Sequence, residues 1–169
     1  ACCLLYTYYY LLYTMVVTAT GHAIIGTSLA AIVPNPFIGI PLAILSHIFA
    51  DAFTHWDTGT NMKKKSKLEL VIGSFIYLGI SFFVPFILTA YLFPQTSLIY
   101  VYIMVIAAQG LDWASAPSVF LGWKFAPITW SNAIQKMFDN RLDKPRGVIY
   151  QVIALLCIIV LSLVIYRIS

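Results

Sequence analysis

The chain has 169 residues, of which 61% are hydrophobic and only 9% charged, with a net charge of +4 and a mean hydropathy of +0.89. Soluble domains carry about a quarter charged residues, and so short a chain cannot hide this much apolar surface from water. The composition therefore excludes an ordinary water-soluble domain and predicts an all-α integral membrane protein with much of its surface in lipid.

The first 14 residues, ACCLLYTYYYLLYT, are rich in tyrosine and lack both a basic region and a clear cleavage site. They are therefore not typical of a signal peptide. We interpret them as an interfacial segment or as an extension outside the functional protein, with Met15 as a suitable natural start. Cys2, Cys3 and Cys157 show neither metal-binding spacing nor a pairing pattern, and Cys157 is interpreted as a small hydrophobic residue within an apolar span.

Five membrane spans follow in chain order, at about residues 16–33, 37–53, 68–93, 97–121 and 147–165. A crossing needs about 20 apolar residues, and fewer where a helix is buried among its neighbours. The segments PNP (34–36) and FPQTS (93–97) contain the prolines that separate spans. The sequence predicts one domain over residues 1–169, a polytopic bundle of about five transmembrane helices. The tryptophans at 123 and 130 indicate an interfacial segment between the fourth and fifth.

Basic residues are concentrated in the loops that follow the second and fourth spans, in KKKSK (63–67) and between Lys124 and Arg146. Short basic loops stay in the cytoplasm, so we expect the first span to start there and the C-terminus to face outward, with Arg167 as the exception. Their position beside the spans favours a role in topology and not nucleic-acid binding. The expected partners are the lipid bilayer and an amphipathic substrate, and the oligomeric state is left open.

Polar residues that are rare in a membrane span cluster in SHIFADAFTHWD (46–57). His47, Asp51 and His55 have the spacing i, i+4, i+8, which predicts that they share one helix face. Counting along both helices from the turn at Asn35 places His22 level with His47. Gly26 and Ala30 are small residues that let the first two spans approach closely.

Asp112, in AAQGLDWASAP, supplies a further carboxylate from the fourth span. It lies about nine residues from the cytoplasmic end of that span, or about 14 Å deep at 1.5 Å per residue. This is close to the depth of His47, and Gln109 lies on a neighbouring face. We therefore expect a polar site within residues 16–57 and 105–115.

An ionised aspartate in mid-membrane costs about 2.5 to 3.5 kcal/mol even on the lenient insertion scale. A divalent cation offsets this cost by turning carboxylates and neutral imidazoles into ligands, and mixed His/Asp ligation suits zinc, with iron or manganese as alternatives. The predicted ligands are His22, His47, Asp51 and His55. His55 is also a candidate general base, and Asp112 a catalytic carboxylate or one that orients a histidine.

Other roles for these residues stay open. The same side chains would also fit a hydrogen-bonded network that only ties helices together. Asp57 fits a helix-end carboxylate that balances Lys63 to Lys65. Arg141, Lys144 and Arg146 are predicted to steer an anionic headgroup.

At TGHAIIGTSLAAI, LSHIFADAFTHWD and LDWASAP the chain resembles the small bacterial multi-pass proteins known as membrane-bound metal-dependent hydrolases. The resemblance covers residues 18–60 well and 105–151 loosely. It implies that His22, His47, Asp51 and His55 are metal ligands or catalytic groups, with Asp112 as a further candidate.

The leading hypothesis is a hydrolase of the bacterial inner membrane that uses a metal at the cytoplasmic face to cleave a lipid-linked or amphipathic ester or phosphoester. One alternative is a transport or ion-binding protein that uses the same histidine–aspartate cluster. Others are a bis-histidine haem protein using His22 and His47, or a non-catalytic membrane subunit.

Overall fold

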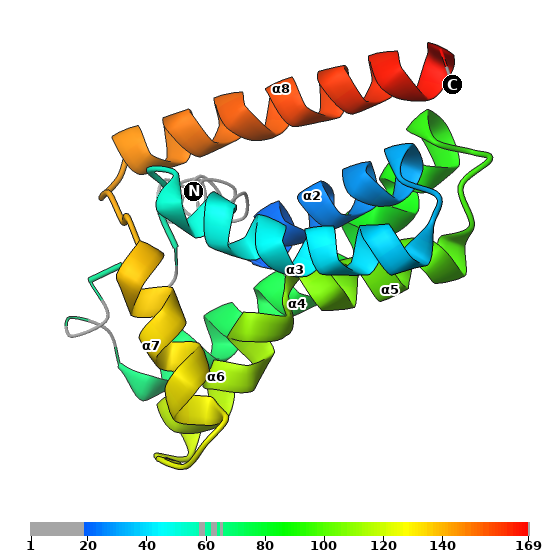
Figure 1. Ribbon diagram of the computed structural model, residues 1–169. Coiled ribbons are helices and arrows are strands. Elements are labelled where there is room, and N and C mark those ends of the chain that lie inside the picture. Colours follow the sequence, from blue (N-terminus) through cyan, green and yellow to red (C-terminus); the bar gives the residue numbers. More distant parts are fainter. Residues whose placement is uncertain (1–18, 58–59, 62–63, 65, 169) are drawn as a thin grey trace.

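The computed structural model describes residues 19–57, 60–61, 64 and 66–168. The interpretations of residues 1–14, of Cys2 and Cys3, and of Lys63 and Lys65 in KKKSK lie outside this range. The described residues form seven helices and no strand apart from one isolated bridge (Figure 1). The all-α class is therefore confirmed.

Two helices are long and apolar enough to cross a membrane, α4 (Lys67–Leu92) and α8 (Arg146–Ile168). A third crossing is present if α5 (Leu98–Ala108) and α6 (Gly110–Phe120), which are bent by 47° at Gln109, count as one span. These two or three candidate spans support a membrane protein.

The expected number of five transmembrane helices is not confirmed. The first two predicted spans form helices at the expected places, α2 (Ala19–Ile32) and α3 (Pro36–Ala52), which have 14 and 17 residues in the described part of the chain. The fourth is broken at Gln109. The segment predicted to lie in the interface contains α7 (Ile128–Phe138), a short amphipathic helix.

The ends of two helices follow from local sequence. The side chain of Asn35 accepts a hydrogen bond from the Phe37 N–H, and Pro36 occupies the first position of α3, where its missing N–H costs nothing. Ser66 and Glu69 form a reciprocal capping box at the start of α4. These caps fix where the predicted helices begin.

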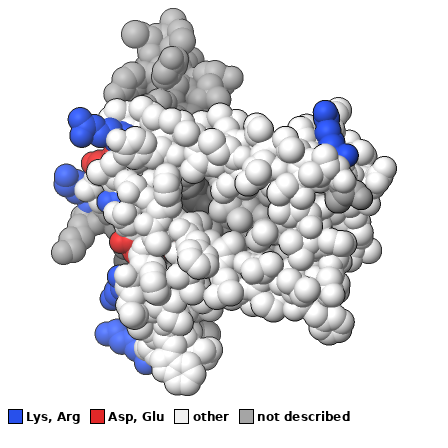
Figure 2. Space-filling view, turned by 45° about the horizontal axis from the view of Figure 1, so that its top comes forward, with Lys and Arg blue, Asp and Glu red and all other residues white. Residues whose placement is uncertain are grey.

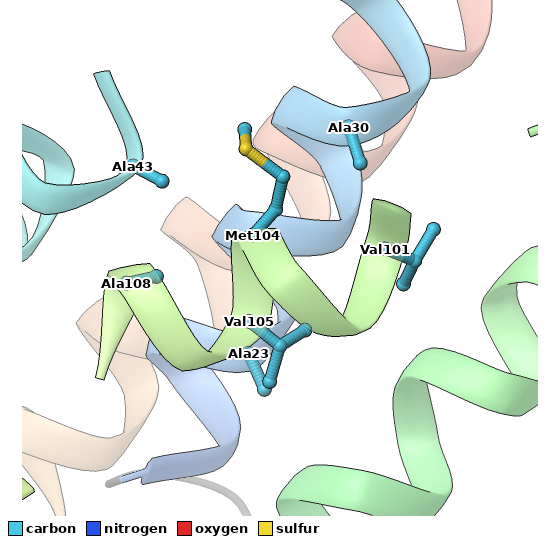
Figure 3. Close-up of a cluster of buried hydrophobic side chains, with 7 residues drawn as sticks. All are labelled: Ala23, Ala30, Ala43, Val101, Met104, Val105 and Ala108. Carbon is cyan, nitrogen blue, oxygen red and sulfur yellow. The ribbon is translucent and has the colours of Figure 1, made fainter. Parts of the chain in front are cut away.

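Helix α2 lies at the centre of the bundle and contacts α3, α4, α5 and α8. Its small residues permit this, because a Cβ atom on Gly26 would lie 2.9 Å from the Met104 carbonyl oxygen of α5. Gly26 therefore brings α2 close to α5, whereas the sequence predicted that it lets α2 approach α3. The buried cluster around this contact joins α2, α3 and α5 (Figure 3); it consists of Ala23, Ala30, Ala43, Val101, Met104, Val105 and Ala108.

The outer faces of the helices expose large hydrophobic side chains, among them Phe37, Phe75 and Leu161. Figure 2 shows an almost uncharged face, with acidic and basic side chains gathered at one end and one basic group at the other. Such a surface suits lipid, flanked by water at the charged end.

Candidate metal centre

The imidazoles of His22 and His47 stack face to face, with ring centroids 3.9 Å apart and planes 13° from parallel. His22 lies on α2 and His47 on α3, and their exposed fractions are 9% and 1%. Counting from the turn at Asn35 placed the two side chains level, and this expectation is confirmed.

Two carboxylates face these imidazoles. The Asp51 oxygens Oδ1 and Oδ2 lie 3.3 Å from Nε2 of His22 and 3.3 Å from Nε2 of His47, respectively. The Asp112 carboxylate lies 4.0 Å from Nε2 of His22 and 3.6 Å from Nε2 of His47. We call these four residues the inner cluster. Within it, His22, His47 and Asp112 offer ligand atoms within 4.8 Å of one another, so this group could hold a metal ion.

The hydrogen bonding of His47 fixes which of its nitrogens faces the carboxylates. Its Nδ1 lies 2.7 Å from the carbonyl oxygen of Ala108. That oxygen can only accept, so Nδ1 carries the proton and donates. Ala108 ends α5, and terminal carbonyls of a helix lack intrahelical donors. The break at Gln109 thus supplies the acceptor that orients His47.

The other nitrogen of His47, Nε2, is buried and has no hydrogen-bond partner among the described residues. In the neutral ring it carries a lone pair, and this lone pair faces two carboxylates. Such an arrangement is repulsive unless a cation, either a proton or a metal ion, lies between the groups. The inner cluster is therefore incomplete without one.

Asp112 reaches the inner cluster because the fourth span bends. Gln109 is fully buried at the bend, where its Oε1 accepts a hydrogen bond from Trp113 Nε1 at 3.2 Å. The chain then restarts as α6, with Asp112 in its first turn. Gln109 makes no hydrogen bond to Asp112 among the described residues, and its Oε1 is taken by Trp113.

The partner of Asp112 is Gln135 of α7, whose Nε2 donates to Oδ1 at 3.1 Å. Sequence reasoning missed this residue. The signal available was the amphipathic pattern of residues 128–138, which places Ser131 and Gln135 on one face. Ser131 donates to the Leu111 carbonyl at 2.8 Å, so the same face of α7 holds α6 at two points.

His55 lies outside the inner cluster. Because α3 ends at Ala52, the expected i, i+4, i+8 helix face does not extend to it. Its Nδ1 bonds to the Phe53 carbonyl at 2.8 Å, and its backbone pairs with Asn140 and Leu142. The helical placement of His55 was thus wrong, whereas its role as a ligand or general base stays a prediction.

A second group, the outer cluster, surrounds Arg141 near His55. Nε of Arg141 lies 3.2 Å from Asp57 and 2.7 Å from Asp139. Burial raises the pKa of Asp139, an effect that Arg141 opposes. Asp57 therefore pairs with Arg141. Of the lysines that the sequence suggested it balances, Lys63 and Lys65 lie outside the described residues. We define the outer cluster as His55, Asp57, Asp139 and Arg141.

The three predicted steering residues occupy different surroundings. Arg141 borders the cavity described below and is engaged by the two carboxylates. The ammonium of Lys144 lies 4.0 Å above the ring of Trp56, and Arg146 is exposed at the start of α8. Arg141 is thus the member of this set that the structure brings to the site.

Both clusters border one cavity of about 1250 Å³. Three members of the inner cluster, His22, Asp51 and Asp112, contribute to its wall. The rest of the lining comes mainly from apolar side chains of α2, α3, α4, α6 and α8. The candidate metal centre is therefore reachable from a large, mostly apolar space.

Comparison with known proteins adds no relative from which a role could be transferred. No protein-family model matches the chain, and neither does any curated protein or solved structure. The function is therefore inferred from the geometry and chemistry of the inner cluster.

Proposed function

We propose that the inner cluster binds a divalent metal ion, zinc in the first place, and that the protein is a metal-dependent hydrolase. Its substrate is a lipid-linked or amphipathic ester or phosphoester. The observation that carries the proposal is the buried, unpartnered Nε2 of His47, which faces the carboxylates of Asp51 and Asp112.

The distances within the inner cluster support this reading. Two ligand atoms at 2.0 to 2.1 Å from a tetrahedral ion lie about 3.3 to 3.4 Å apart. Three of the four nitrogen–oxygen distances, 3.3, 3.3 and 3.6 Å, are near that spacing. Charge-assisted hydrogen bonds are shorter, at about 2.7 to 2.9 Å. The two imidazole rings are stacked and nearly parallel. For both Nε2 atoms to bind one ion, the rings must tilt so that these two atoms point toward the same position beside the carboxylates.

Each residue of the site has a distinct task in this proposal. His22, His47, Asp51 and Asp112 hold the ion, while the Ala108 carbonyl fixes the tautomer of His47 and Gln135 orients Asp112. A bound divalent ion would polarise the scissile oxygen and make a water nucleophilic near neutral pH. His55 borders the same cavity and would carry a proton to or from the reacting groups.

Three further features favour a lipid-linked substrate. Two or three helices can cross a membrane, the cavity beside the inner cluster is mostly apolar, and the charges on the face in Figure 2 gather mainly at one end. The resemblance to bacterial membrane-bound metal-dependent hydrolases points the same way. We therefore propose a place in the bacterial inner membrane with the basic loops and the site on the cytoplasmic side.

Elemental analysis of the detergent-purified protein tests the metal directly. We expect near-stoichiometric zinc, iron or manganese in the natural chain and its loss in His47→Ala. His55→Ala is the matched control, since it also removes a histidine at the cavity but lies outside the inner cluster, and it should keep the metal. Hydrolysis of p-nitrophenyl esters and of bis-p-nitrophenyl phosphate in mixed micelles should be blocked by a chelator and restored by the metal.

Two results would contradict the proposal. If the purified protein contains no metal but keeps its helical fold by circular dichroism, the inner cluster is not a metal site. Metal-loaded protein that hydrolyses neither class of substrate, but carries protons or cations across vesicles in an Asp51-dependent way, would favour the transport alternative.

A further inference from the structure

The cavity at the inner cluster continues as a groove along one face of α2. Seven residues of that helix border it, and four of them, His22, Ile25, Leu29 and Ile32, follow one another at spacings close to whole helical turns. These positions lie on one side of a helix. The groove therefore follows α2 from the polar site to the far end of the helix.

The length of the groove matches one leaflet of a bilayer. From His22 to Ile32 a helix rises about 15 Å at 1.5 Å per residue. The hydrocarbon core of a bilayer is about 30 Å thick, so each leaflet contributes about 15 Å. A ligand that lies along this groove thus has the length of one lipid tail.

The walls of the groove come from α3 and α8, which flank α2. Helix α8 contributes Ala154, Ile158 and Leu161, and α3 contributes Leu45 and Phe49. Phe49 and Leu161 are also largely exposed on the outer surface, at 74% and 61%. Figure 2 shows how little charge such an outer face of the molecule carries. The groove therefore borders the surface that lipid would cover.

The polarity of the groove changes from one end to the other. Carboxylates and an imidazole lie at the His22 end, whereas the deeper wall is mostly aliphatic, with hydroxyls at Ser28 and Ser162. The groove is thus polar at one end and apolar along the remainder, which matches a lipid with one polar head and one hydrocarbon chain. It sets the direction in which a lipid would bind.

We propose that this groove holds one hydrocarbon chain of a membrane lipid, with the chain along α2 and the cleavable ester or phosphoester at the inner cluster. This deepens the proposed function, on which the position of the cleavable group rests. The chain enters sideways from the leaflet between α3 and α8. The site thereby acts on a lipid that never leaves the membrane.

Saturable photolabelling tests the chain-binding site without relying on activity. The protein in lipid nanodiscs is labelled with a diazirine-bearing palmitic acid, with and without excess unlabelled palmitic acid. The labelled peptides are mapped by mass spectrometry. We expect competed labelling in α2 and α8, and its loss in Ala154→Trp, whose indole would fill the groove. Ile158→Trp provides a second plug should the first variant fold poorly.

Ile153→Trp is the matched control, because Ile153 lies on the same helix but is 54% exposed and does not border the groove. It should label like the natural chain. The proposal that the groove binds a lipid chain would be refuted if unlabelled palmitic acid does not compete with the labelling. It would also be refuted if labelling is unchanged in both Ala154→Trp and Ile158→Trp. Competed labelling seen only after removal of residues 1–18 would also overturn it, because that segment would then be the occupant.

The two proposals fail separately. His47→Ala and chelated protein should still show competed labelling, since the groove does not need the metal. Competed labelling in a protein that never binds metal would refute the hydrolase and leave a lipid site. A metal-loaded protein without competed labelling would refute the groove alone.

Discussion

The inner and outer clusters border the same cavity and contain the same kinds of acidic and imidazole groups, but they differ in what balances their negative charge. In the outer cluster, Arg141 supplies a permanent cation to Asp57 and Asp139. In the inner cluster, Asp51 and Asp112 face two imidazoles, which are cationic only when protonated. The buried Nε2 of His47 has no hydrogen-bond partner among the residues that the structure describes.

This difference separates a structural role from a binding role. A guanidinium that serves two carboxylates leaves little attraction for a further cation. Carboxylates that face neutral imidazoles attract one strongly, and burial increases the attraction because water screens it less. We therefore expect substitutions in the inner cluster to lower the metal content, and substitutions in the outer cluster to lower the free energy of unfolding.

The largest expected effect comes from one matched pair of substitutions, Asp112→Asn and Asp57→Asn. Each replaces one carboxylate by an amide of the same shape. Asp112→Asn should lose most of the bound metal and more than about 100-fold in hydrolysis, because a ligand matters more than the groups that support it. Asp57→Asn should keep the metal. Elemental analysis and micellar assays measure both, and equal metal loss in the two variants would erase the distinction between the clusters.

A smaller effect is expected where α7 supports the inner cluster. Gln135→Leu keeps the side-chain volume but removes the donor to Asp112 Oδ1. Loss of such a supporting hydrogen bond costs about 10- to 100-fold in metal affinity. Competition with a fluorescent zinc chelator gives the affinity. Gln95→Leu, in the loop between α4 and α5, is the control and should keep the metal affinity. An unchanged metal affinity in Gln135→Leu would show that α7 does not support the site.

The packing that brings α2 to the inner cluster can be tested with two glycines. A Cβ on Gly26 would meet the backbone of Met104, which cannot move alone, whereas a Cβ on Gly79 meets nothing within 4 Å. Gly26→Ala should lower the free energy of unfolding by about 1 to 3 kcal/mol, as overpacking does. Gly79→Ala should be neutral or stabilising by up to about 1 kcal/mol. Denaturation in detergent followed by circular dichroism compares them, and equal stability would mean that the close approach of α2 to α5 is unimportant.

The sequence predicts those contacts of the inner cluster that can be found by counting residues along regular helices. His22 and His47 were paired by counting from Asn35, since both helices are regular up to that turn. The helical rise likewise predicted that Asp112 lies near His47, and the two side chains are 3.6 Å apart. The Gln109 bend and the donor from Gln135 did not follow, because each depends on a neighbouring helix that no local pattern specifies.

The position of His55, in the outer cluster, was predicted wrongly because the helix was expected to continue through it. Helical periodicity was extended through residue 55, but α3 ends where the backbone N–H of Asn140 donates to the Asp51 carbonyl at 3.0 Å. The side chain of Asn140 also donates to Thr54 at 3.0 Å. A partner 86 residues away along the chain thus helps to end the helix. Tertiary contacts override the helical pattern here, as they commonly override local preference.

The smallest effect belongs to the outer cluster itself. Arg141→Met should leave metal content unchanged and cost about 1 kcal/mol in stability, because the pair is partly exposed and water screens it. Burial raises the pKa of Asp139 above its ordinary value of 3.8. The unfolded state therefore ionises first, and the free energy of unfolding falls as pH rises from that value through the raised pKa. Without Arg141 the pKa of Asp139 should rise further, so the fall should steepen and extend to higher pH. Thermal unfolding in detergent between about pH 4 and about pH 7 measures the slope, with Asp139→Asn as the control that removes it. Loss of metal in Arg141→Met would instead show that the two clusters form one site.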